Sequence, residues 1–222
     1  MFLGYQIASV LLMVVVCALL SGVVGWLTGN TEISKTVFKI TLIAEALLMI
    51  LGPANKNNAN DNTSGVAAVM EIMARLTEEQ CSKVAFLLFD NEEKGLLGSG
   101  AYARKHKAVK QNKLIINMDC VGDGKHILCF ANKRTRKLPV FPALNAAMEA
   151  QSGRYFLMNE LEKSIYPSDQ KHFQYGVAVC ACQKSELFGY YCDKIHTAKD
   201  TVCEQVNLNF IADGMVQFVG HI

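Results

Sequence analysis

Four carboxylates and one imidazole stand out because each follows an expected strand or lies in a loop at its end. Asp61 lies in NANDNTSGVA, Glu92 and Glu93 in FDNEEKGLLGSG, Asp119 in IINMDCVG and His196 in DKIHTAKDT. Zinc binds carboxylate oxygens and imidazole nitrogens, and a catalytic zinc site keeps one position open. Three carboxylates and the imidazole can hold zinc, which leaves one glutamate to move a proton. The set is typical of a metal-dependent hydrolase.

The types and neighbours of these residues suggest a role for each. Asp61 is suited to bridge two metal ions that lie about 3.5–4 Å apart. Asp119 would bind one ion, and Glu93 and His196 would bind the other. Adjacent side chains diverge, so Glu92 fits better as the general base that takes a proton from water and returns it to a leaving amine. Taken singly, each acid could be a surface residue or a helix cap.

Apolar runs predict the elements that position these side chains. The runs KVAFLLFD (83–90) and KLIINMD (113–119) are typical of strands buried on both faces, and each ends in a carboxylate. Further strands are expected in HILCF and GVAVCAC, and helices in the segments beginning SGVAAV, GLLGSG, LPVFPA and EQVNLN. Alternating strands and helices predict a three-layer α/β domain whose mainly parallel sheet is flanked by helices. Ligands of such sheets bind outside the carboxyl ends of the strands, so the acids would gather there.

The first fifty residues differ from the rest in character. Residues 2–28 contain no charged side chain, and a helix of that length can cross a hydrocarbon core of about 30 Å. A cleaved signal peptide is the alternative, but the basic start is missing and the apolar run is too long. Residues 36–52 could form a second span, an interfacial helix or a packed helix, since Lys39 and Glu45 are costly at membrane depth. We expect a transmembrane segment or hairpin over residues 1–53 and a catalytic domain over residues 54–222.

Composition indicates which kinds of partner are excluded and which cellular compartment is expected. The formal net charge of +2 is too balanced to suggest a nucleic-acid partner, and no basic cluster alternates with aromatic residues on an expected face. The eight cysteines include no C-x-x-C pair, which argues against a structural zinc knuckle. Reduced, buried thiols in a domain that faces the cytoplasm are favoured over a disulfide framework. The expected localisation is therefore the membrane, with the catalytic domain on the cytoplasmic side.

From residue 60 to the C-terminus, the sequence resembles the di-zinc aminopeptidases of peptidase family M28, which also contains glutaminyl cyclases and metal-free receptor ectodomains. The matching segments, in the order of the family, are NDNTSGVA, FLLFDNEEKGLLGSGAY, INMDCVG, YPSDQKHF and IHTAKDT. The resemblance implies a zinc exopeptidase fold, two zinc ions in a complete domain and a peptide substrate. It also implies a bridging Asp61, a proton shuttle at Glu92, and metal ligation by Glu93, Asp119 and His196.

The YPSDQKHF segment carries two further candidates. Tyr166 and Asp169 are candidate substrate or oxyanion residues, although Gln170 stands where the family usually has His. His172 is the one substitute ligand close to a site segment.

One departure from the family pattern concerns the metal site. Members normally supply another metal-binding His from a His-x-Asp segment well upstream, but no His precedes Asp61 in this sequence. Three interpretations compete: a fragment of a longer chain in which Met1 is internal, a single zinc held by Asp61, Glu93 and His196, or lost catalysis. The fragment is favoured because it accounts for both the missing ligand and the missing first strands.

These observations together predict a membrane-anchored zinc aminopeptidase that acts on peptide N-termini, with a domain incomplete at its N-terminal side. A single-zinc glutaminyl-cyclase-like acyltransferase and a catalytically inactive membrane receptor or scaffold are the alternatives.

Overall fold

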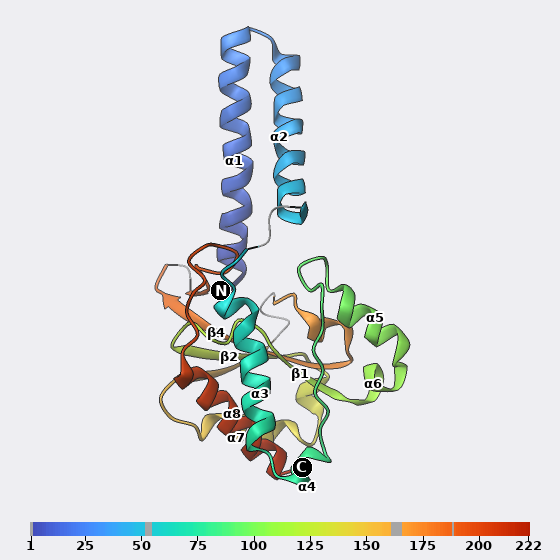
Figure 1. The fold of residues 1–222 in the computed structure, drawn as a ribbon. Coiled ribbons are helices and arrows are strands. Elements are labelled where there is room, and N and C mark those ends of the chain that lie inside the picture. The colour runs from blue at the N-terminus through green and yellow to red at the C-terminus, as the bar shows by residue number, and fades with distance from the viewer. Residues whose placement is uncertain (1, 52–54, 161–165, 188) are drawn as a thin grey trace. The chain divides into compact units, whose positions relative to one another are not determined.

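The computed structural model describes residues 2–51, 55–160, 166–187 and 189–222, and only the backbone of residues 2–9 and 48–51. The chain divides into two compact units, Met1–Ala54 and Asn55–Ile222 (Figure 1). The expected boundary between residues 53 and 54 lies outside the described residues. The two units are described separately below.

Two antiparallel helices form the first unit, α1 (Phe2–Thr28) and α2 (Thr31–Leu51) (Figure 1). Gly29 joins them with a φ of +64°, a left-handed conformation that glycine adopts without a steric penalty. Between the helices, the Cys17 thiol donates a hydrogen bond to Glu45 Oε2 at 3.2 Å. Glu45, one of the two charges that weakened the expectation of a second span, therefore has a partner within its own unit.

One N-terminal helix is apolar enough to cross a membrane. Val10–Thr28 of α1 has a mean hydropathy of 2.7, and only 11% of it is buried within the structure. In its described residues, α2 does not meet the same measure of length and composition. The second span over residues 36–52 thus stays a prediction.

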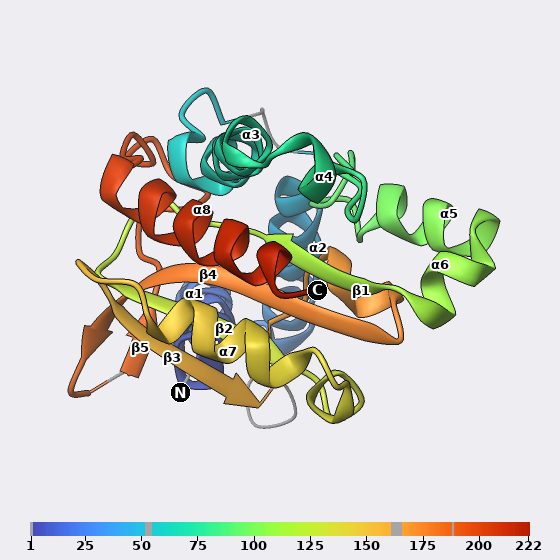
Figure 2. The ribbon, with the colours of Figure 1, turned by 90° about the horizontal axis from the view of Figure 1, so that it is seen from below.

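A mixed sheet lies at the centre of the second unit (Figures 1 and 2). Its strands are β1 (Leu114–Met118), β2 (His126–Ala131), β3 (Tyr155–Glu160), β4 (Tyr175–Ser185) and β5 (Gly189–Tyr191). The strand order is β1-β4-β2-β3, and β5 pairs with β4. The β1/β4 and β2/β3 pairs are parallel, whereas the β2/β4 and β4/β5 pairs are antiparallel.

The expectation of a mainly parallel sheet is therefore wrong. Only residues 119–125 connect β1 to β2, and they contain no helix. A parallel crossover needs a dozen or more residues. The short connection therefore returns the chain on the other side of β4, with β2 antiparallel to it.

Two strand assignments also differ from the sequence prediction. A buried strand was expected over residues 83–90. Residues 84–90 instead run as an open stretch between α4 (Glu78–Cys81) and α5 (Leu97–Lys105) and pair with no strand in the described part of the chain (Figure 1). The unexpected strand β3 pairs along its whole length with β2. Residues 84–90 are the more apolar of these two segments, but within the described residues only β3 has a neighbouring strand to pair with. Pairing, and not apolar content, therefore decides which segment becomes a strand.

Three helices pack on one face of the sheet: α3 (Gly65–Arg75), α7 (Phe141–Glu149) and α8 (Gln205–Gly220) (Figure 2). Helix α8 contacts both α3 and α7. Alternate residues of the central strands are buried against this layer: Ile127, Cys129, Ala131, Val177, Val179 and Ala181. The expected flanking of a sheet by helices is confirmed on this face.

Loops cover buried residues on the other side of the central strands. The Phe130 ring stacks on Tyr166 with a centroid distance of 5.4 Å, and the sulfurs of Cys180 and Cys182 are 3.6 Å apart. All eight cysteines are free. The other helical segments of the described residues are α6 (Lys107–Asn112) and the short turns η1 (Ala59–Ser64), η2 (Thr135–Lys137) and η4 (Asp169–His172).

Candidate metal centre

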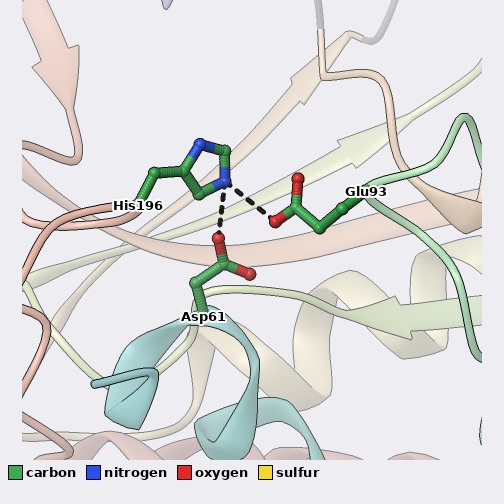
Figure 3. Close-up of side chains that lie close together, drawn as sticks. All are labelled: Asp61, Glu93 and His196. Atoms are coloured by element: carbon green, nitrogen blue, oxygen red, sulfur yellow. Dashed lines mark ion pairs between the residues drawn. The ribbon is translucent and has the colours of Figure 1, made fainter. Parts of the chain in front are cut away.

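Three side chains from distant segments meet in the second unit (Figure 3). The Nε2 atom of His196 lies 2.9 Å from Asp61 Oδ2 and 2.9 Å from Glu93 Oε1. Asp61 comes from η1, Glu93 from the loop before α5, and His196 from the loop between β5 and α8. The three potential ligand atoms lie within 4.8 Å of one another.

A shared proton holds these three groups together. The hydrogen bonds to Asp61 and Glu93 raise the pKa of His196 to about 10. The hydrogen bond from His196 in turn lowers the pKa of Glu93. Zinc lies about 2.0–2.2 Å from its nitrogen and oxygen ligands, which places tetrahedral ligands roughly 3.3–3.6 Å apart. The observed separations of 2.9 Å are a few tenths of an ångström shorter, so a small outward movement of these side chains fits zinc in place of the proton.

Asp61 also belongs to a second group of candidate ligands, with Asp119 and Cys120. Asp119 directly follows β1, and its N–H donates to the carbonyl of Val179 in β4 at 3.0 Å. Burial raises the pKa of Asp119 to about 6. Burial also raises the pKa of the Cys120 thiol, which keeps it protonated. Among the described residues, this group therefore offers two carboxylates and no ring nitrogen.

Glu92 lies beside both groups but is a member of neither. Its side chain is half-buried. Burial, followed by the charges of Asp119 and Glu93, raises the pKa of Glu92 to about 8. A carboxyl group with such a pKa can both accept and release a proton near neutral pH.

The two candidates in the YPSDQKHF segment have different surroundings. The Tyr166 hydroxyl donates to the carbonyl of Asp119 at 2.9 Å, which ties the loop that follows β1. Asp169 is 7% exposed, and its Oδ1 has no hydrogen-bond partner among the described residues. Burial raises the pKa of Asp169, and its charge contributes to the raised pKa of Glu92. An oxyanion role for either residue stays a prediction. His172 belongs to neither metal group.

Sequence reasoning missed Asp200, which fixes the loop that carries Asp61. The Asp200 carboxylate is 1% exposed and accepts hydrogen bonds from the N–H groups of Asn60 at 2.7 Å and Asp61 at 2.9 Å. The only signal in the sequence was the acid directly after IHTAK. Nothing local distinguishes such a buried acid from a solvated one.

The asparagines on either side of Asp61 join its loop to the end of β1. Asn60 Oδ1 accepts hydrogen bonds from the N–H groups of Gly122 and Asp123 at 2.7 and 3.1 Å. Asn62 donates to the carbonyl of Met118 at 3.0 Å. The loops that carry Asp61 and Asp119 are therefore held as one piece.

Comparisons with known proteins give a family and a fold for this chain. The sequence matches the model of peptidase family M28 over residues 46–217. No curated protein matches the sequence. Similar solved structures include a zinc aminopeptidase from Bacillus subtilis (20% identity, TM-score 0.56, covering 74% of this chain and 42% of that one). Others are an aminopeptidase from Aneurinibacillus sp. strain AM-1 (20%, 0.50, 74% and 39%) and the LapA aminopeptidase of Legionella pneumophila (17%, 0.52, 73% and 46%).

These structural likenesses show a shared fold. This chain spans less than half the length of each of these three structures. The family match, in contrast, covers most of the sequence, including all five candidate site residues. The chain therefore belongs to peptidase family M28.

Proposed function

We propose that residues 55–222 belong to the catalytic domain of a zinc-dependent aminopeptidase, which removes residues from the N-termini of peptides. The observation that carries the proposal is the convergence of Asp61, Glu93 and His196, whose ligand atoms lie within 4.8 Å of one another. Several carboxylates at such a point repel one another unless a cation or a proton lies between them. Family membership and the fold of the aminopeptidase structures support the same activity.

In this proposal, Asp61, Glu93 and His196 hold one zinc ion, and Asp61 with Asp119 contributes to a second position. When bound, zinc is a Lewis acid that polarises the scissile carbonyl and lowers the pKa of water. The hydrogen bonds that Asp200 accepts hold the Asp61 loop in place, with Asp61 between Asp119 and His196. This loop therefore needs no rearrangement during the reaction.

Glu92 is proposed as the general base. It takes a proton from the attacking water and returns it to the nitrogen of the leaving amine, so that no net proton is consumed. Its pKa of about 8 in the metal-free site suits both directions of transfer. A bound cation would lower this pKa towards neutrality, because it offsets the surrounding negative charge.

We also propose that α1 anchors the chain in a membrane, with the catalytic unit on the cytoplasmic side. The apolar stretch Val10–Thr28 supports the anchor, and the eight free cysteines are consistent with a reducing compartment. A protease-protection assay on sealed vesicles tests the side.

The enzymatic proposal is tested with the full chain in detergent. Zinc content is measured by metal analysis, and release of the N-terminal residue is followed on peptides with free and acetylated N-termini. The expected result is chelator-sensitive release from the free peptides alone. Glu92→Gln should retain zinc and lose turnover by a factor of about 10²–10⁴. The control Glu149→Gln changes an exposed glutamate in α7 and should behave as wild type.

Two results would contradict the proposal. One is a wild-type chain that binds no zinc, which would favour the non-catalytic receptor or scaffold. The other is unchanged turnover in Glu92→Gln, which would remove Glu92 from the role of base.

A single-zinc glutaminyl cyclase is the second candidate, because only one of the two ligand groups in the described residues contains a ring nitrogen. A cyclase would release ammonia from peptides that begin with Gln and leave the other peptides intact. Mass spectrometry of the same peptide panel separates the two activities.

A further inference from the structure

A cavity of about 360 Å³ lies at the end of the sheet where β1 and β4 begin. Its lining comes from three places: α6, the loop after β2, and η4 with the residues that lead from it into β4. Three of the seven lining residues are cations, and none is an acid. The cations are Lys110, Arg134 and Lys171, and all three are exposed. The cavity is therefore positively charged and open to solvent.

The three cations of this cavity have no anionic partner in the described part of the chain. They form no ion pair there, whereas the neighbouring Arg136 pairs with Glu160. Their side chains also donate no hydrogen bond to a described residue. A recess that is lined by charges of one sign concentrates counter-ions. An anion is therefore the ligand that this cavity attracts.

The sequence around the cavity keeps acids away from it. Residues 101–118, which include α6, contain no Asp or Glu, and neither do residues 124–148, which include the loop after β2. Asp169 is two residues before Lys171, but it is buried and its charge acts on Glu92. The positive charge of the lining is thus not offset by its surroundings.

Hydrogen bonds to Gln174 hold the walls of the cavity together. The N–H of Gln174 donates to the carbonyl of Lys110 at 2.9 Å. Its carbonyl accepts from Asn132 Nδ2 at 3.2 Å, and Asn132 Oδ1 accepts from the N–H of Arg134 at 3.0 Å. The backbone positions of Lys110 and Arg134 are therefore fixed relative to each other. A ligand needs to order only their side chains.

The cavity is separate from the metal centre. Lys110 and Gln111 precede β1, whereas Asp119 directly follows it. A strand of five residues extends about 17 Å. No lining residue belongs to either group of candidate metal ligands. A ligand of this cavity is therefore distinct from the peptide substrate of the proposed aminopeptidase.

We propose that the cavity binds a small phosphate monoester, whose phosphate group is held by Lys110, Arg134 and Lys171. Three cations match a phosphate dianion with three terminal oxygens, whereas a single carboxylate is satisfied by one bidentate arginine. The volume of about 360 Å³ equals that of about twelve water molecules, so it has room for an organic part beside the phosphate. Gln111 and Gln174 offer amide groups to that part, which is therefore polar.

The phosphate group can come from a soluble ester or from the headgroup of phosphatidic acid, and the experiment has an arm for each source. Both arms use the full chain after zinc has been stripped and the chelator removed by dialysis. Phosphate then has no metal ion to bind. Because binding in the cavity requires neither zinc nor turnover, its failure would leave the proposed aminopeptidase activity untouched.

The first arm follows glycerol 3-phosphate by ³¹P NMR while the chain in non-ionic detergent is added at constant ionic strength. The expected result is saturable binding to one site with a Kd of about 1 mM. Unphosphorylated glycerol should not compete. The second arm places the chain in phosphatidylcholine nanodiscs with and without phosphatidic acid. Loss of glycerol 3-phosphate binding in the presence of phosphatidic acid would identify the lipid as the source, and unchanged binding would identify a soluble ester.

Matched variants locate the site. Lys110→Gln and Arg134→Gln each remove one cation from the lining at an exposed position, so the fold should tolerate them. Each should weaken binding by about tenfold. Lys107→Gln removes the same charge one turn earlier in α6, at an exposed position outside the lining. Its effect should stay within about twofold, because salt screens charges that do not contact the ligand.

Three outcomes would overturn the proposal. The first is no saturable binding of the phosphate group in either arm. The second is full affinity in both Lys110→Gln and Arg134→Gln. The third is an equal loss of affinity in Lys107→Gln, which would mean a diffuse attraction of polyanions, such as nucleic acids, to the basic surface.

Discussion

Replacing Asp200 by Asn is expected to loosen the loop that carries Asp61. The Asp200 carboxylate is buried and accepts two backbone N–H groups, from Asn60 and Asp61. Hydrogen bonds to a charged group contribute about 1.5–3 kcal/mol each. The amide of Asn can accept one of them at neutral strength, while its NH₂ group faces the other donor and leaves it unpaired. The expected loss of stability is about 3 kcal/mol.

This loss is large enough to measure by thermal unfolding in the presence of a chelator. For a domain of this size, each kcal/mol shifts Tm by about 2–4 °C, so Asp200→Asn should lower Tm by roughly 6–12 °C. A second measurement follows zinc affinity by competition with a chelating dye. Partners that orient a ligand typically change metal affinity by about 10–100-fold, and a weakening in this range is expected here.

Asp213→Asn is the matched control. Asp213 is 54% exposed and pairs with Arg75 at 2.7 Å on the surface, so its replacement should cost less than about 1 kcal/mol. If Asp200→Asn matches this control in both Tm and zinc affinity, the two hydrogen bonds do not hold the Asp61 loop, and the reasoning is refuted.

Two further variants test the roles of His196 and Tyr166. In the metal-free protein, the pKa of His196 is raised to about 10. Its stabilising effect should therefore be complete below the unfolded pKa of about 6.5 and should disappear as pH rises towards 10. The Tm advantage of wild type over His196→Gln should shrink across that range, and an advantage independent of pH would contradict the ion pair. Tyr166→Phe removes the donor to the Asp119 carbonyl and should lower stability by about 1 kcal/mol with turnover unchanged. A fall in kcat of about 10²–10³ would instead assign Tyr166 to an oxyanion.

The sequence was sufficient for the features that depend on local chemistry. The run of residues 2–28 predicts a long apolar helix because most of its residues are apolar and none is charged. The segments of Glu92, Glu93 and Asp119 are recognisable because they come at the ends of apolar runs that are typical of buried strands. The family match confirms the resemblance on which the proposed roles rest.

Strand pairing could not be obtained in the same way. The apolar runs at 83–90 and 113–119 look alike in sequence, yet within the described residues only the second pairs, because β4 is beside it. The direction of β2 depends on the length of the connection that precedes it. The partner strand β4 lies far away along the chain from β1 and β2, so the pairing is decided only when the sheet assembles.

The sequence by itself determined which side chains can bind a cation and which segment is apolar enough for a membrane, since residue type alone carries charge and hydrophobicity. Only the tertiary structure decided that Asp61, Glu93 and His196 meet within 4.8 Å and that the buried Asp200 holds the loop that carries Asp61. Such contacts span more than a hundred residues along the chain, and the local pattern around an acid is the same whether the fold buries it or leaves it in water.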